Sequence, residues 1–134
     1  MKLLLVEDNL GDVGLIREAF ASCQAEVEIR VARDGVDALD RLDRAAHADL
    51  PDLILLDLNL PRMDGRELLS RLKSDPELRA IPVAVFTSSS APRDVERAYA
   101  MQANCYLVKP PDLTGIERVV SLLNEFWFKT VRLP

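Results

Sequence analysis

The sequence predicts an α/β domain built on a parallel sheet, and three observations lead to this fold class. Short apolar runs of strand length alternate along the chain with amphipathic stretches of helical length. Four of these runs are apolar throughout, as in strands buried on both faces of a parallel sheet. Turn signals such as Asp34-Gly35 and Asp75-Pro76 separate the two kinds of segment. A strand followed by a helix, repeated five times, therefore fits one domain of 134 residues.

The five expected strands differ in how deeply they should be buried. The fully apolar runs are Leu3–Val6, Leu53–Leu56, Val83–Phe86 and Tyr106–Val108. The remaining run, Val27–Val31, alternates apolar and polar residues, which is typical of a less buried strand at the edge of a sheet.

Each expected strand precedes an expected helix whose apolar residues recur at helical spacing. In the first three helices these residues are Val13, Ile16 and Phe20, then Val36, Leu39 and Leu42, then Leu68, Leu69 and Leu72. A fourth helix is expected at Ala91–Met101 and a fifth at Ile116–Thr130. We expect residues 125–134 to form a short apolar extension of the last helix.

Composition and charge exclude several classes of protein. The formal net charge of −5 argues against a nucleic-acid binder that works through a basic face. No apolar stretch approaches the roughly 20 residues that a membrane span needs, and acids follow the N-terminal apolar run where a signal peptide would be cleaved. The two cysteines, Cys23 and Cys105, lack metal-binding or redox spacing and suit a reducing compartment. We therefore expect a cytoplasmic protein.

Polar residues follow four of the expected strands at the point where each strand ends. They are Glu7 and Asp8, Asp57, Thr87, and Lys109. Ligands of parallel α/β sheets bind beyond the carboxyl ends of the strands, and these residues meet there if the four strands are neighbours. Three carboxylates in one cleft repel one another unless a cation is close. Because the candidate ligands are hard oxygens, Mg²⁺ is favoured over zinc.

Each of these residues also has a purely structural explanation. Asp8 or Asn9 could cap the helix that follows the first strand, Thr87 could cap a later helix, and Lys109 could be a surface charge. Such residues at four strand ends are better explained together, as a site in which the carboxylate of Asp57 is a nucleophile.

Four motifs in the chain resemble the signatures of response-regulator receiver domains, the family of the chemotaxis regulators. They are VEDN at 6–9, LLDLNLPRMDG at 55–65, FTSS at 86–89 and YLVKP at 106–110. The resemblance covers nearly the whole chain. It implies a flavodoxin-like three-layer sandwich with strand order 2-1-3-4-5, and a place in a two-component phosphorelay.

The resemblance also implies a role for each of the polar residues that follow the four strands. Asp57 would accept a phosphoryl group from a phosphohistidine of a sensor histidine kinase. Mg²⁺ would be bound by Asp8, Asp57 and the backbone carbonyl of Asn59, and Glu7 would hold a metal-bound water. Lys109 would contact the carboxylate or the phosphoryl oxygens. Such a protein catalyses its own phosphotransfer and slow dephosphorylation, and is otherwise not an enzyme.

Two residues are expected to carry the signal away from the phosphoryl group. Thr87 would donate its hydroxyl to a phosphoryl oxygen, and Tyr106 would move between exposed and buried positions as Thr87 shifts. An alternative for Tyr106 is an ordinary half-buried aromatic residue of a strand.

The last turns hold more apolar residues than a helix covering one side of a sheet requires. Phe126, Trp127 and Phe128 are the candidate contacts of a homodimer, because exposed apolar patches mark interfaces. The alternative is a tail that folds back onto its own core. The C-terminal segment resembles small, single-domain regulators of cyanobacterial and bacterial phytochrome kinases, which implies a dimer through the fourth helix, fifth strand and fifth helix.

Two other functions are alternatives to a response regulator without an output domain. A phosphatase of the haloacid dehalogenase type needs an acid two residues after its nucleophile, where this chain has Asn59. It also usually needs a cap segment that a chain of this length cannot hold. A receiver-like binding module that is never phosphorylated has no need of Asp8, Asp57, Thr87 and Lys109 together.

Overall fold

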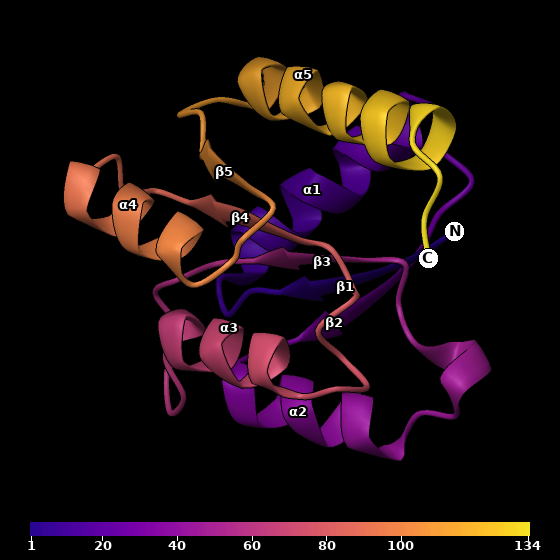
Figure 1. Cartoon of the computed structure of the whole chain (residues 1–134). Helices are drawn as coiled ribbons and strands as arrows, with labels where there is room; N and C mark the ends of the chain where they lie inside the picture. The colour runs from indigo at the N-terminus through magenta and orange to yellow at the C-terminus, as the bar shows by residue number, and fades with distance from the viewer.

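Five parallel strands form the middle layer of the protein, whose computed structural model describes residues 1–134 (Figure 1). The strands are β1 (Lys2–Val6), β2 (Glu28–Ala32), β3 (Leu53–Leu56), β4 (Val83–Thr87) and β5 (Cys105–Val108). They pair in the order β2-β1-β3-β4-β5, which confirms the expected sheet. The alternating strand β2 lies at one edge of this sheet, as its sequence predicts.

Helices cover both faces of the sheet. They are α1 (Leu10–Ser22), α2 (Gly35–Arg44), α3 (Gly65–Ser74), α4 (Pro92–Ala100) and α5 (Leu113–Leu123), with a 3₁₀ turn at His47–Asp49. Helices α1 and α5 pack on one face, and α2, α3 and α4 pack on the other (Figure 1). None of the helices has the length and apolar character that crossing a membrane requires.

The alternation of side chains along each strand divides the core into two clusters. In β1, Leu3 and Leu5 belong to the cluster under α1 and α5, whereas Leu4 and Val6 belong to the cluster under α2, α3 and α4. Successive residues of a strand point to opposite faces, so a strand covered on both sides must be apolar at every position. This requirement explains the uninterrupted apolar run of β3, whose four residues are fully buried.

The end of the chain differs from the expected fifth helix at Ile116–Thr130. Helix α5 begins earlier, at Leu113, because the side chain of Asp112 caps it by accepting from the backbone N–H of Gly115 at 2.8 Å. The α-helix ends at Leu123, and a π-helical segment follows at Asn124–Thr130.

Gly65 begins α3 and brings that helix against the strand that ends at Asp57. A Cβ atom at this position would lie 2.2 Å from the carbonyl oxygen of Asp57 and 2.6 Å from the Cα of Leu58. The backbone φ of Gly65 is not positive, so the glycine is required for this close approach and not for a left-handed backbone conformation.

We expect Gly65→Ala to lower the free energy of unfolding by about 1–3 kcal/mol, because the added methyl group must displace backbone atoms. Gly14→Ala is the matched control, since a Cβ there meets no atom within 4 Å and the helix α1 gains a better helix former. Urea unfolding of both variants measures the difference. Equal losses in the two variants would contradict the close approach at Gly65.

Candidate functional site

The carboxyl ends of β1, β3, β4 and β5 bring together the charged side chains that follow these strands. The ammonium group of Lys109 donates hydrogen bonds to Glu7 Oε1 and, at 2.9 Å, to Asp57 Oδ2. The hydroxyl of Thr87 donates to Asp57 Oδ1 at 2.8 Å. The structure therefore places these four residues in one hydrogen-bonded group at the rim of the sheet.

Asp57 is a buried carboxylate whose two oxygens are both bonded. Besides Thr87, the backbone N–H of Asn59 donates to Oδ1 at 3.1 Å. Burial by itself would raise the pKa of Asp57, but the hydrogen bonds from Lys109, Asn59 and Thr87 and the charge of Lys109 lower it below its ordinary value. Asp57 is thus held ionised, which is the state that a nucleophilic carboxylate needs.

Lys109 supplies the positive charge of the site from a side chain that is only 8% exposed. Burial lowers the pKa of this ammonium, but the bonds to Glu7, Asp57 and Asp12 outweigh burial and raise it. The contact with Asp12, at 2.9 Å, was not expected from the sequence. Asp12 is an acidic residue in the first turn of α1, where acids commonly stabilise the helix dipole, so its sequence position did not distinguish it.

Glu7 is the most buried of the acids, with 1% of the residue exposed. The backbone N–H of Asn9 donates to its Oε2 at 3.2 Å. Burial and the charge of Asp57 raise the pKa of Glu7 to about 7, although the hydrogen bond from Lys109 acts in the opposite direction. A further positive charge at the rim would favour the ionised form of this residue.

Three acids at the rim can approach a single cation. Carboxylate oxygens of Glu7, Asp8 and Asp57 lie within 4.8 Å of one another. Asp8 is exposed, and Asn9 caps α1 by accepting from the N–H of Asp12 at 3.0 Å, so Asp8 is not needed as a cap. The donor set is entirely oxygen and fits a hard divalent cation.

Thr87 and Tyr106 are joined to the loop between β4 and α4. Thr87 does not cap α4, because it is fully buried at the end of β4 and its hydroxyl contacts Asp57. The half-buried Tyr106 donates its hydroxyl to the carbonyl of Ser89 at 2.8 Å. The hydroxyl of Ser89 donates to Asp94 at 2.6 Å, and Arg66 donates to the same carboxylate at 2.8 Å. This chain of bonds connects the loop that follows Thr87 to α3, α4 and β5.

The three aromatic residues near the C-terminus differ in exposure. Phe126 is 51% exposed, whereas Trp127 and Phe128 are half-buried and pack against the cluster under α1 and α5. The tail therefore folds back in part onto its own core and leaves the ring of Phe126 exposed.

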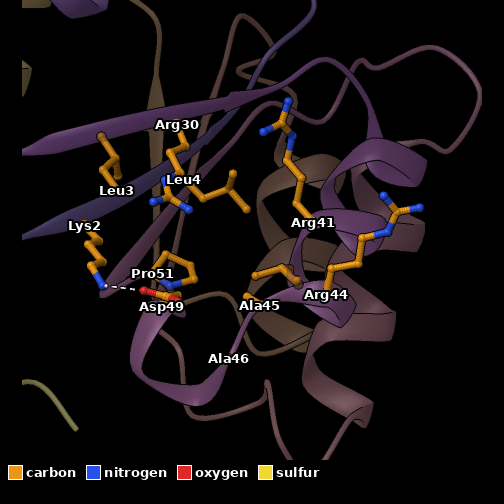
Figure 2. Close-up of a pocket in the computed structure, with 11 residues that line it drawn as sticks. Lys2, Leu3, Leu4, Arg30, Arg41, Arg44, Ala45, Ala46, Asp49 and Pro51 are labelled. Carbon is orange, nitrogen blue, oxygen red and sulfur yellow. Dashed lines mark hydrogen bonds and ion pairs between the residues drawn. The ribbon is translucent and has the colours of Figure 1, made fainter.

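A hollow of about 350 Å³ lies at the opposite, amino-terminal end of the strands, between β1, β2 and the end of α2 (Figure 2). Arg41 and Arg44 line it, and each pairs with an aspartate four residues earlier on its own helix. The guanidinium groups of both arginines are turned away from Pro51 (Figure 2). The hollow does not belong to the rim that holds Asp57.

Comparison with known proteins agrees with the resemblance to receiver domains. The model of the response regulator receiver domain family matches residues 3–121. The chain therefore belongs to this family.

Close relatives are similar over nearly their whole length. Response regulator Rcp1 of Synechocystis is 40% identical over 98% of this chain and 92% of its own length. The probable methanogenesis regulatory protein FilR2 of Methanothrix harundinacea is 42% identical over 98% of this chain and 86% of its own length.

Solved structures show the same similarity in three dimensions. The phosphorylated cyanobacterial phytochrome response regulator RcpA is 43% identical, with a TM-score of 0.93 over 99% of this chain and 97% of that chain. The Mn²⁺-bound form of Rcp1 is 40% identical, with a TM-score of 0.90 over 99% of this chain and 98% of that chain.

We expect Lys109→Met to lower the free energy of unfolding in metal-free buffer at neutral pH by about 3–5 kcal/mol, because Glu7 and Asp57 lose their buried counter-charge. Lys2→Met is the control, since it removes an exposed ion pair worth less than about 1 kcal/mol. Adding Asp57→Asn to Lys109→Met should recover part of the loss. A double variant no more stable than Lys109→Met would show that repulsion between the acids is not the cause.

Proposed function

We propose that this protein is a response regulator whose Asp57 accepts a phosphoryl group from a phosphohistidine of a sensor histidine kinase. The observation that carries the proposal is the ionised, buried Asp57 held between Lys109 and Thr87. An oxygen of Asp57 forms the new bond to phosphorus while the P–N bond of the phosphohistidine breaks. The bonding electrons leave with the imidazole nitrogen, which takes a proton from water.

The residues of the chain favour this transfer mainly by positioning and by charge. Two anions must approach each other, so a carboxylate attacks phosphorus only where positive charge offsets their repulsion. Lys109 lies 2.9 Å from the carboxylate of Asp57 and supplies such a charge in a buried setting. The hydroxyl of Thr87 can rotate from Asp57 to donate to an oxygen of the phosphoryl group.

The proposed cation is Mg²⁺, bound by Asp8, Asp57 and the backbone carbonyl of Asn59, with Glu7 holding a metal-bound water. The oxygen-only donor set and the grouping of the three carboxylates support this choice. The structure of Rcp1 with Mn²⁺ supports a divalent site in that relative. A bound cation would neutralise the carboxylates and the oxygens of the transferred group.

The proposed signal is a change in the loop between β4 and α4. Phosphorylation adds about one and a half to two negative charges, so Thr87 and Lys109 gain new acceptors. A shift of Thr87 would pull on the loop that contains Ser89, to which Tyr106 is bonded. Tyr106 would then report the phosphorylation state at the surface formed by α4 and β5.

The cognate kinase is proposed to be a phytochrome kinase, because RcpA is described as a phytochrome response regulator. The similar identity to FilR2, named for methanogenesis, makes a direct test necessary. Purified phytochrome kinases should transfer phosphate to this protein faster than kinases of other pathways do. No transfer from any phytochrome kinase would reject the assignment.

A homodimer through α4, β5 and α5 is also proposed. The exposed apolar side chains on this side are Tyr99, Val108, Leu122 and Phe126. A hollow of about 180 Å³ between β5 and α5 is lined only by apolar residues, among them Leu122 and Phe126. Apolar surface of this kind is stabilised when a second copy covers it.

Asp57→Asn should abolish the gain of one phosphoryl group when the protein is incubated with Mg²⁺ and acetyl phosphate, because the amide is not a nucleophile. Intact-mass measurement under acidic conditions detects the modification. Asp43→Asn removes an exposed carboxylate of α2 and should be modified like the parent. Asp8→Asn should need more Mg²⁺ for the same extent of reaction.

Two results would overturn this proposal. Modification of Asp57→Asn to the extent seen in the parent would place the phosphoryl group elsewhere. Rapid turnover of many phosphate esters by the parent would instead favour the phosphatase, despite Asn59 at the position of its acid.

Phe126→Asp should shift the protein from dimer to monomer in sedimentation experiments, because a charge at the proposed contact opposes burial. Val36→Asp changes an exposed apolar residue on α2, away from this surface, and should leave the dimer intact. A parent protein that is monomeric at all accessible concentrations would refute the dimer.

A further inference from the structure

Asp12 joins helix α1 to the functional site through one ion pair. Its Oδ2 accepts from the ammonium group of Lys109 at 2.9 Å, across 97 residues of sequence. Lys109 is its one ion-pair partner, and the side chain of Asn9 caps the helix at the N–H of Asp12. The carboxylate of Asp12 is therefore not needed to begin α1.

The hydrogen bonds of Lys109 leave no donor for a new acceptor. A lysine ammonium has three N–H donors. In this structure Lys109 bonds to three carboxylates, those of Glu7, Asp12 and Asp57. An oxygen of an arriving phosphoryl group can therefore pair with Lys109 only when one of the three carboxylates is released.

The three carboxylates differ in what their release would cost. The side chains of Glu7 and Asp57 are 1% and 8% exposed, whereas that of Asp12 is 30% exposed. A buried carboxylate that loses its counter-charge stays without water, which is strongly unfavourable. Asp12 can turn toward solvent and regain hydration, so it is the partner that Lys109 can exchange.

We propose that Asp12 is a positioning residue that competes with the phosphoryl group for Lys109. It holds the ammonium group in the unphosphorylated protein and gives up its place when a phosphoryl oxygen arrives. This inference rests on the proposed phosphorylation of Asp57. Asp12 therefore raises the concentration of phosphodonor that half-saturates the site, because it occupies Lys109 and because its charge repels an anionic donor.

The test compares phosphorylation of Asp12→Asn and the parent over a range of acetyl phosphate concentrations at fixed Mg²⁺. We expect the half-saturating concentration to fall about threefold to fivefold, the effect of one partly exposed ion pair. The limiting rate should change less than about twofold, because the bond-forming group at Asp57 is the same. A merely structural role for Asp12 would not lower the half-saturating concentration while leaving the limiting rate nearly unchanged.

Two control variants make the comparison specific. Asp12→Glu keeps a carboxylate within reach of Lys109 and should return the half-saturating concentration toward that of the parent. Glu18→Gln removes the same charge from an exposed position on the same helix, and it should leave the half-saturating concentration near the parent value. Asp12→Ser is a second removal variant and should behave like Asp12→Asn.

The outcomes separate the inference from the function on which it rests. The competition is overturned if the parent is phosphorylated but Asp12→Asn and Asp12→Ser have half-saturating concentrations that equal or exceed that of Glu18→Gln. Failure of the parent itself to gain a phosphoryl group would overturn the proposed function. Loss of phosphorylation in folded Asp12→Asn would show that Asp12 assists Lys109, which also contradicts the inference.

Discussion

The buried ammonium of Lys109 is the interaction on which the site depends. It bonds to acids from α1 and from the ends of β1 and β3, which would otherwise repel one another at the rim. Lys109 itself follows β5, and it reaches these acids because the parallel order of the sheet directs the carboxyl ends of the strands to one edge. The fold and the chemistry are coupled through this side chain. The sheet brings Lys109 next to the acids, and the positive charge of Lys109 permits the burial of the Asp57 carboxylate.

Such a balance suits a module that responds to added charge. The carboxylates at the rim outnumber the single ammonium group, so their excess negative charge favours a divalent cation. The three N–H donors of Lys109 are all used before any phosphoryl group arrives. Added charge must therefore rearrange existing bonds. The hydroxyl of Thr87 and the bond from Tyr106 to Ser89 lie next to that rearrangement and lead toward α4 and β5. Local electrostatics and a small set of exchangeable hydrogen bonds can together shift the populations of two conformations.

The sequence was informative where the signal is local. Apolar runs of strand length located four strands and an alternating run located β2, and the carboxylate of Asp57 was conspicuous because it directly follows one of the apolar runs. Lys109 could be placed beside it because strand ends in a parallel sheet share an edge. Asp12 was missed because its partner is 97 residues away and its own position is ordinary for an acid at a helix start. The close approach at Gly65 and the π-helical geometry after Leu123 depend on tertiary packing, which a linear pattern does not encode.

The two apolar clusters on opposite faces of the sheet bear on how this molecule can change during evolution. Neighbouring residues of a strand, such as Leu4 and Leu5, belong to different clusters. Substitutions under α1 and α5 should therefore combine additively in free energy with substitutions under α2, α3 and α4, because they share no packing partners. One half of the core can then drift while the other is preserved. A lineage could then repack the core under α1 and α5 without retuning the core under α2, α3 and α4.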